Sequence, residues 1–179
     1  MNPRTSLDAD RVRTLFDELS DRLATLGMTA QLFVVGGAAM ALAYDRSRFT
    51  RDVDAVFVPV QEVRRVAEEL SEVYGLEPDW LNDAAKGFLP GEDKNPRTVF
   101  ESDSLLVQVP SPEYMLALKL HASRDKRDLE DAAILCRQLG FTDEEQCAQL
   151  LSAMYPAERL LPRHRYILQE VIDLASKLH

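Results

Sequence analysis

Residues 33–58 read FVVGGAAMALAYDRSRFTRDVDAVFV, and this stretch decides the fold. The apolar run at residues 32–35 predicts a short buried strand that stops at Gly36-Gly37, where missing side chains permit a tight turn and close approach of the backbone to a ligand. Residues 38–44 are rich in Ala, Leu and Met and predict a two-turn helix. A basic loop at residues 46–51 and a second strand at residues 52–58 complete the stretch.

Two carboxylates lie on the second predicted strand. Asp52 and Asp54 are two residues apart, so both side chains point to one face. Both faces of this strand are largely apolar, which predicts an interior strand of a covered sheet. Neighbouring carboxylates in such a place repel each other and lose solvation, and a bound divalent cation offsets both costs. Because Mg²⁺ is usually held by one or two carboxylates and substrate phosphates, we expect Asp52 and Asp54 to hold Mg²⁺ or Mn²⁺.

The glycine pair and the basic loop predict a phosphate site. Gly36 and Gly37 supply backbone N–H groups at a helix N-terminus, where an anionic phosphate is favoured. Arg46, Arg48 and Arg51 add positive charge for a triphosphate or a nucleic-acid backbone. An isolated Asp-x-Asp or Gly-Gly pair is common, whereas the ordered set of strand, glycines, helix, basic loop and acidic strand is much more specific.

This ordered set resembles the signature of the nucleotidyltransferase superfamily, which has the polymerase-beta-like fold. The form VVGGAAMALAYDRSRFTRDVDAVF is most similar to the AbiEii and MenT-type branch of small bacterial toxin-like nucleotidyltransferases. The resemblance implies catalytic and metal-binding roles for Asp52 and Asp54. It implies nucleotide-binding roles for a larger set: Gly36, Gly37, Arg46, Arg48, Thr50 and Arg51.

A second block of the chain extends the resemblance. Lys119 interrupts an otherwise apolar helical surface, and a helix predicted to start near residue 124 carries Asp128 and Asp131 on one face. A lysine followed by an Arg-Asp-x-x-Asp helix is similar to the second block of AbiEii-like enzymes. That similarity implies a phosphate or nucleotide contact for Lys119 and an extra catalytic acid at Asp128 or Asp131. On the residues alone, a lysine reaching solvent and ion pairs that join two helices stay open as alternatives.

One position departs from the superfamily pattern. Relatives often carry a third carboxylate on a strand after the Asp-x-Asp strand, and the corresponding strand here, residues 105–109, has Gln108. Glutamine is a neutral ligand and cannot act as a base. A different third acid, weaker metal binding and a catalytically silent chain are all consistent with this residue.

The rest of the chain predicts a fold of the α/β (α+β) class. We expect a mixed sheet flanked by helices in residues 1–110, and a helical region in residues 111–179 that packs on this core. Further strands are expected at 97–101 and 105–109, and the Pro- and Gly-rich region 76–96 is expected to hold only a short helix near Asp79–Lys86 and a loop. Amphipathic or capped segments predict the other helices, at 8–26, 60–74, 142–155 and after Pro162.

Composition limits the classes of function. The chain has 179 residues, 46% of them hydrophobic and 28% charged, as in soluble globular proteins. No apolar run approaches the roughly 20 residues that span a bilayer, so we expect a cytoplasmic protein with no membrane partner. The net charge of −9 argues against a surface that coats nucleic acid, although a local basic patch such as Arg163-His164-Arg165 is compatible with RNA. Cys136 and Cys147 lack metal-like spacing and are interpreted as reduced packing residues.

Three functional hypotheses follow. The first is a Mg²⁺-dependent enzyme that moves a nucleotide from a nucleoside triphosphate to an acceptor hydroxyl; by resemblance the acceptor is the end of a tRNA, and the enzyme is a toxin neutralised by an antitoxin partner. The second keeps the chemistry and replaces the acceptor by a small molecule, such as an antibiotic hydroxyl. The third is a catalytically silent binding module or antitoxin-like partner, which Gln108 favours.

Overall fold

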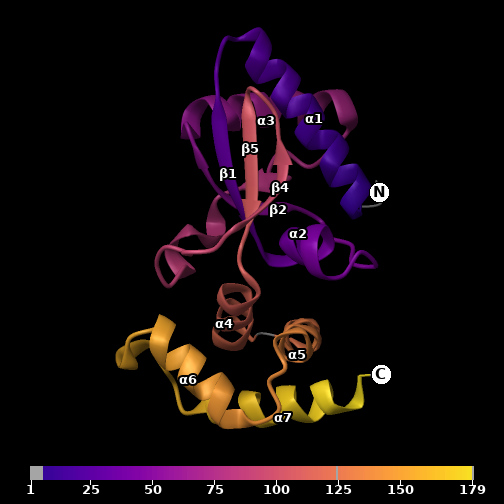
Figure 1. Cartoon of the computed structure of the whole chain (residues 1–179). Helices are drawn as coiled ribbons and strands as arrows, with labels where there is room; N and C mark the ends of the chain where they lie inside the picture. Colours follow the sequence, from indigo (N-terminus) through magenta and orange to yellow (C-terminus); the bar gives the residue numbers. More distant parts are fainter. Residues whose placement is uncertain (1–5, 124, 179) are drawn as a thin grey trace. The chain divides into compact units, whose positions relative to one another are not determined.

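The computed structural model describes residues 6–123 and 125–178 of the chain. The chain forms two compact units, which are described separately (Figure 1). The sheet unit runs to Phe88 and resumes from Pro96 to Pro110, and the helical unit consists of Leu89–Asn95 and the chain from Ser111 onward. The segment 89–95 therefore belongs with the C-terminal helices although it lies between two parts of the sheet unit.

The sheet unit is built on one five-stranded mixed sheet with the order β3-β2-β1-β5-β4. The central strand β1 pairs antiparallel with β2 and parallel with β5. The predicted mixed α/β class is therefore confirmed. The strands are β1 (Ala30–Val35), β2 (Val53–Val58), β3 (Leu81–Asn82), β4 (Arg97–Glu101) and β5 (Leu105–Val109).

One face of the sheet forms the core with two amphipathic helices, α1 (Ala9–Thr25) and α3 (Val60–Tyr74). Alternate strand residues such as Val34 and Ala55 are fully buried there, because strand side chains alternate between faces. The prediction that β2 is an interior strand is confirmed, since β3 and β1 flank it, but the predicted cover on both faces is wrong. Its second face carries Val58, which is 54% exposed, so the strand follows the pattern of a sheet with one face less covered.

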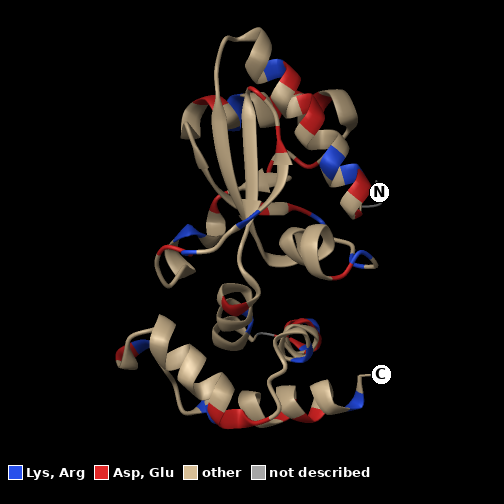
Figure 2. Cartoon of the chain, in the orientation of Figure 1, with Lys and Arg blue, Asp and Glu red and all other residues tan. Residues whose placement is uncertain are grey.

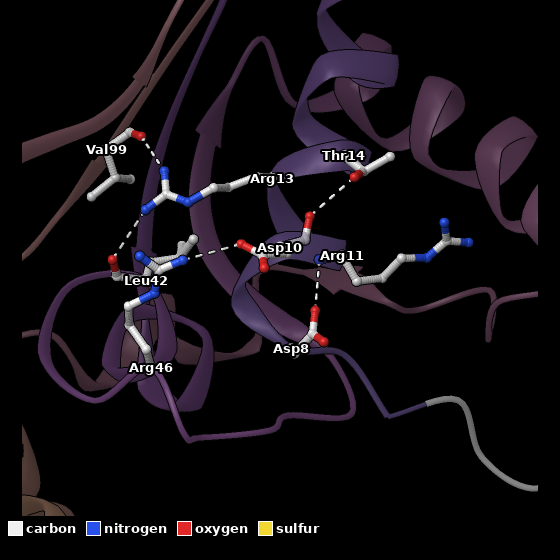
Figure 3. Close-up of polar contacts among 8 residues, drawn as sticks. All are labelled: Asp8, Asp10, Arg11, Arg13, Thr14, Leu42, Arg46 and Val99. Carbon is white, nitrogen blue, oxygen red and sulfur yellow. Dashed lines mark hydrogen bonds and ion pairs between the residues drawn. The ribbon is translucent and has the colours of Figure 1, made fainter.

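The glycine bend after β1 leads into the short helix α2 (Gly36–Ala39), which continues as the single-turn π-helix η1 (Met40–Tyr44). The sequence predicts one regular helix here, and the structure differs in its last turn, where Asp45 N donates to Met40 O at 2.7 Å. Arg13 of α1 fixes this turn by donating to Leu42 O at 3.2 Å and to Val99 O of β4 at 2.8 Å (Figure 3). A helix, a π-turn and an edge strand are thus joined by one guanidinium.

The region between α3 and β4 differs from its prediction. Residues 79–86 do not form a regular helix: Leu81–Asn82 pair with β2 as β3, and a 3₁₀-helix, η2 (Ala84–Phe88), follows. Trp80 anchors this region by packing, since it is 1% exposed and its Nε1 donates to Ala67 O at 2.9 Å. This anchor sets the position at which β3 joins the sheet.

The helical unit contains four α-helices and a 3₁₀ turn within its described residues. They are α4 (Pro112–Ala122), α5 (Lys126–Leu139), α6 (Glu144–Met154), η3 (Ala157–Arg159) and α7 (Arg163–Lys177). The N-cap of α6 is Asp143, one residue after the predicted Thr142, because Gln146 rather than Glu145 completes the capping box. Loop 89–95 joins this unit through Asp93, whose carboxylate accepts from Ser111 N at 2.6 Å and Ser111 Oγ at 3.0 Å.

Two features of the helical unit refine the sequence analysis. Cys136 and Cys147 are buried free thiols with their sulfur atoms 3.6 Å apart. His164 is buried rather than part of a basic surface, and its Nδ1 accepts from Leu161 N at 2.9 Å. Within the described residues, no helix has the length and apolar character needed to cross a bilayer.

Candidate active site

The glycine bend and the acidic strand meet at one end of the sheet. β1 and β2 are antiparallel, and Val35, the last residue of β1, lies opposite Asp54 of β2. The glycine bend therefore begins beside Asp54. A Cβ atom on Gly36 would lie 3.2 Å from Asp54 Oδ2. The glycine bend and this acid are therefore in contact, and Gly36 is required twice, for its φ of +65° and for the space that the carboxylate uses.

Gly37, the second glycine of the bend, leaves space for the hydroxyl group of Thr50. A Cβ atom on Gly37 would lie 3.0 Å from Thr50 Oγ1, a distance that real Cβ atoms seldom reach. Thr50 Oγ1 in turn donates to Asp52 O at 2.9 Å, which fixes the backbone just before β2. Gly36, Gly37, Thr50 and Asp54 therefore form a continuous surface of backbone, hydroxyl and carboxylate, which we call the glycine-bend site.

Asp52 lies at the entrance to β2 rather than within it, since the strand begins at Val53. Its side chain is half-buried. Burial raises the pKa of this carboxyl, the negative charge of Asp79 raises the pKa further, and Arg51 opposes both effects. A partly desolvated carboxylate next to another acid gains from any nearby positive charge, so Asp52 is electrostatically suited to a cation.

Two arginines of the basic loop, Arg46 and Arg48, contact acids of the sheet unit. Arg46 Nη2 lies 3.3 Å from Asp10 Oδ1 of α1, with both side chains about four-fifths exposed (Figure 3). Arg48 Nε lies 3.5 Å from Asp45 Oδ2, and these side chains are mostly buried. Figure 2 shows acidic and basic residues interspersed on this loop beside α2. Arg48 thus shapes the loop, whereas Arg46 holds a surface pair that is easily exchanged for another anion.

Gln108 shares a sheet face with Asp54. Gln108 and Val56 both lie opposite Phe33, and Asp54 lies opposite Val35, so all of these side chains point to the same side. Gln108 is two strands away from Asp54, and its Nε2 lies 3.5 Å from Thr98 Oγ1 of β4. The described residues contain no group of three or more His, Cys, Asp or Glu side chains placed to hold a metal ion.

The residues of the second block form an ion-pair cluster inside the helical unit. Lys119 Nζ of α4 lies 2.8 Å from Asp128 Oδ1 and 2.8 Å from Asp131 Oδ2 of α5. The three side chains are only 9%, 13% and 2% exposed, in that order. Lys119 therefore does not reach solvent, and the cluster of Lys119, Asp128 and Asp131, which we call the Lys119 cluster, joins α4 to α5. Of the explanations left open by the sequence, ion pairing between the helices is the one observed.

The structure thus brings seven of the expected residues together in two sets, each within one unit, and leaves Asp52 and the three arginines of the loop outside both sets. The glycine-bend site lies in the sheet unit, and the Lys119 cluster lies in the helical unit. Sequence reasoning missed Leu7, which exchanges two backbone hydrogen bonds with Thr50 at 2.7 and 2.9 Å, and Arg13, which fixes η1. The bridge between Leu7 and Thr50 is isolated, so no periodic pattern in the sequence indicates it. Arg13 occupies a polar position of the amphipathic helix α1, and nothing in the sequence distinguishes it from the other polar residues there.

Comparison with known proteins places these residues in a family. A family model described as nucleotidyltransferase of unknown function (DUF6036) matches residues 10–143, from α1 to the N-cap of α6. The search of curated proteins found no match. A solved structure, the crystal structure of an antigenic nucleotidyltransferase-like protein from Paracoccidioides brasiliensis, aligns at 16% identity with a TM-score of 0.46 over 93% of this chain and 95% of that chain.

The family match covers well over half of the chain and includes both the glycine-bend site and the Lys119 cluster. The chain therefore belongs to the nucleotidyltransferases of unknown function, the DUF6036 family.

Proposed function

We propose that this protein transfers a nucleotide from a nucleoside triphosphate to an acceptor hydroxyl and releases pyrophosphate, using Mg²⁺ or Mn²⁺. The observation that carries the proposal is the contact between the glycine bend and Asp54, because it sets a carboxylate directly beside the half-buried backbone of Gly36. The family match to nucleotidyltransferases supports the same chemistry.

The glycine-bend site suits a divalent cation held together with phosphates. Two carboxylates are the number that Mg²⁺ commonly takes from a protein when substrate oxygens complete its shell. The Asp54 carboxylate lies so close to Gly36 that any side chain at position 36 would press against it. Asp52 is half-buried, and its pKa is raised. When bound at Asp52 and Asp54, the ion would neutralise charge that develops on the triphosphate.

The other residues of the site bind and orient the substrate. In this proposal the backbone N–H groups of Gly36 and Gly37 and the hydroxyl of Thr50 contact phosphate oxygens. Arg46 and Arg51 neutralise the same phosphates from the loop, while Arg48 supports the loop through Asp45. In this proposal Asp54 accepts the proton of the acceptor hydroxyl.

The Lys119 cluster enters the proposal as a second set of catalytic residues. The support for a catalytic role of Lys119, Asp128 and Asp131 is their similarity to the second block of AbiEii-like enzymes, and Asp128 is the more exposed of the two acids. The observed ion pairs do not conflict with this role, because a lysine held by two carboxylates keeps its charge and a fixed position. The ion pairs also make the cluster a structural link, so its two roles need separate measurements.

For the acceptor we propose the end of a tRNA, which would make the protein a toxin with a cognate antitoxin. The support is the similarity of residues 33–58 to the AbiEii and MenT-type toxins. The alternative acceptor is a small molecule such as an antibiotic, and the same assay tests it in a second arm. A net charge of −9 favours this alternative because it attracts cationic acceptors.

The test is a transfer assay with nucleoside triphosphates labelled in the α-phosphate, Mg²⁺, and either total tRNA or a panel of cationic antibiotics. The wild-type protein should label one acceptor class, and Asp54→Asn, which keeps the size of the side chain, should abolish labelling. Asp103→Asn is the matched control, because Asp103 lies in the β4–β5 turn at the other end of the sheet.

Both variants should unfold at the wild-type temperature. Labelling by Asp54→Asn at the wild-type rate would refute the mechanism. Failure of the wild-type protein to bind any nucleotide with Mg²⁺ in calorimetry would leave the silent binding module as the function.

A further inference from the structure

Two buried thiols contact each other inside the helical unit. Cys136 lies in the last turn of α5, Cys147 lies near the start of α6, and their sulfur atoms are 3.6 Å apart. Both residues are fully buried. The chain has two cysteines, so each has the other as its one possible partner for an intramolecular disulfide. We call Cys136 and Cys147 the thiol pair.

The short connection between α5 and α6 fixes the backbone on both sides of the thiol pair. Phe141 N donates to Cys136 O at 2.9 Å, which closes the end of α5. Asp143 Oδ1 accepts from Gln146 N at 3.0 Å, which caps the start of α6. The two thiols are therefore brought together by held backbone, and joining them costs little further conformational entropy.

The positions of the sulfur atoms suit a bond between them. A disulfide requires the sulfur atoms to be about 2.0 Å apart. Each sulfur turns about its own Cα–Cβ bond, so adjustment of the two χ1 angles brings the sulfur atoms closer. The resulting bond would link α5 directly to α6.

The hydrogen bond within the thiol pair makes the two groups unequal. The Cys136 thiol donates to Cys147 Sγ and lowers the pKa of Cys147, while burial and the negative charges of Asp143 and Glu144 oppose this effect. The same hydrogen bond, together with burial, raises the pKa of Cys136. Because the thiolate is the reactive form of cysteine, Cys147 is the first nucleophile and Cys136 is the resolving thiol.

We propose that the thiol pair is a site of reversible oxidation, at which a hydroperoxide converts Cys136 and Cys147 to a disulfide that joins α5 to α6. The Cys147 thiolate attacks the terminal oxygen of the hydroperoxide and the O–O bond breaks. The other oxygen leaves with the proton that Cys147 has lost, as water or an alcohol, and Cys147 becomes a sulfenic acid.

The second step consumes the sulfenic acid. The sulfur of Cys136 attacks the sulfur of Cys147, the S–O bond breaks, and the oxygen leaves as water with the proton of Cys136. The two thiols are thereby oxidised by two electrons and the hydroperoxide is reduced by two. A dithiol reductant restores both thiols by exchange. This site is independent of the proposed nucleotide transfer.

The experiment treats the folded protein with hydrogen peroxide and analyses a non-reducing digest by mass spectrometry. The digest of the wild-type protein should contain a peptide in which Cys136 is linked to Cys147. The treated protein should also melt roughly 5–10 °C above the reduced protein, since the disulfide closes a loop between positions 11 residues apart in the unfolded chain. Dithiothreitol should reverse both changes. Cys147→Ala is the control for the rise in melting temperature, because it cannot form the bond.

The order of the two steps is tested with both single variants and dimedone, which traps sulfenic acids. Cys136→Ala should accumulate the adduct at Cys147, and Cys147→Ala should give much less adduct at Cys136. Protein unfolded in urea serves as the reference for the reagent. Folded wild-type protein that keeps both thiols, under conditions that oxidise the unfolded chain, would overturn the proposal and leave the thiol pair as packing residues. Oxidation that yields only sulfinic acid or disulfides between molecules would overturn it as well.

Discussion

Asp54 Oδ2 occupies the space in which a side chain of residue 36 would begin, since a Cβ atom on Gly36 would lie 3.2 Å away. The same glycine has a φ of +65°, in the left-handed region. Backbone conformation and side-chain contact therefore demand glycine independently at the point where the proposed phosphate site is formed.

Gly36→Ala should lose activity through the position of Asp54 rather than through unfolding alone. The left-handed φ costs about 1–2 kcal/mol of stability in any L-residue. The added contact displaces the carboxylate, and a displacement on the order of 1 Å at a catalytic group lowers the rate about 10²-fold. The measurement is the transfer rate together with the free energy of unfolding in urea.

Gly27→Ala is the control for this variant. Gly27 has a φ of +66° and nothing within 4 Å of its Cβ position, so it should show the stability loss without the loss of rate. Equal rates for the two variants would contradict the role of the Gly36–Asp54 contact.

Asp52→Asn should stabilise the metal-free protein at neutral pH. Burial raises the pKa of Asp52 in the folded state, so the folded protein binds this proton more readily than the unfolded chain does. The ionised carboxylate therefore lowers stability above the raised pKa, and this cost disappears as the pH falls below the ordinary value of 3.8. Urea unfolding of both proteins at about pH 7 and pH 4 measures the difference.

Mg²⁺ with nucleotide should reverse the order of stability of the wild-type protein and Asp52→Asn. Mg²⁺ with nucleotide should raise the melting temperature of wild type at neutral pH and leave Asp52→Asn nearly unchanged. A wild-type protein that gains nothing from Mg²⁺ and nucleotide would contradict metal binding at Asp52.

Lys119→Met should destabilise the protein by about 3–5 kcal/mol, because it removes a buried cation that lies 2.8 Å from a carboxylate oxygen of Asp128 and 2.8 Å from one of Asp131. Lys126→Met is the control, since Lys126 is 85% exposed and its pair with Glu130 contributes less than about 1 kcal/mol. Lys119→Arg keeps the charge and separates the two roles of the residue. If Lys119→Arg retains stability but not transfer, Lys119 also contacts substrate, whereas retention of both shows a structural role alone.

His121 should make the helical unit sensitive to mild acid. Its ring stacks on Tyr155 at 4.0 Å and lies 5.2 Å from the ring of His164. Burial lowers the pKa of His121, and electrostatic interactions with His164, Arg159 and Arg163 lower it further, while the hydrogen bond to Arg159 O opposes this. The stability contributed by the neutral ring is complete above the ordinary value of 6.5 and is lost as the pH falls through the lowered pKa.

The melting temperature between about pH 8 and pH 5 tests this dependence on His121. His121→Phe keeps an aromatic ring on Tyr155 and should flatten the profile. An equally steep profile in His121→Phe would assign the acid sensitivity to other groups.

The sequence predicted helices and strands correctly where the local residue pattern favours the same secondary structure that tertiary packing stabilises. The ends of β4 and β5 and the glycine stop after α3 follow from apolar alternation and turn residues, and all are observed as expected. β3 was missed because its two residues form a strand only through the pairing of Leu81 with Val53, which local propensity does not encode.

The site shows the same division. The meeting of Gly36 and Asp54 was predictable, since a strand that ends in a bend and an antiparallel neighbour that starts with an acid must meet at one edge. The burial of Lys119 was not predictable from its own helix, because the two compensating charges come from α5. The position of Leu7 beside Thr50 was equally hidden, since two single residues far apart in the chain leave no periodic pattern.

The segment 89–95 limits how this protein can be divided by cloning. Asp93 holds Ser111, the N-cap of α4, and Tyr114 donates to Gly91 O at 2.5 Å. A fragment that starts at Ser111 would lose both partners, although it would contain every C-terminal helix. Expression of the helices alone therefore calls for a circularly permuted or co-expressed piece that supplies residues 89–95.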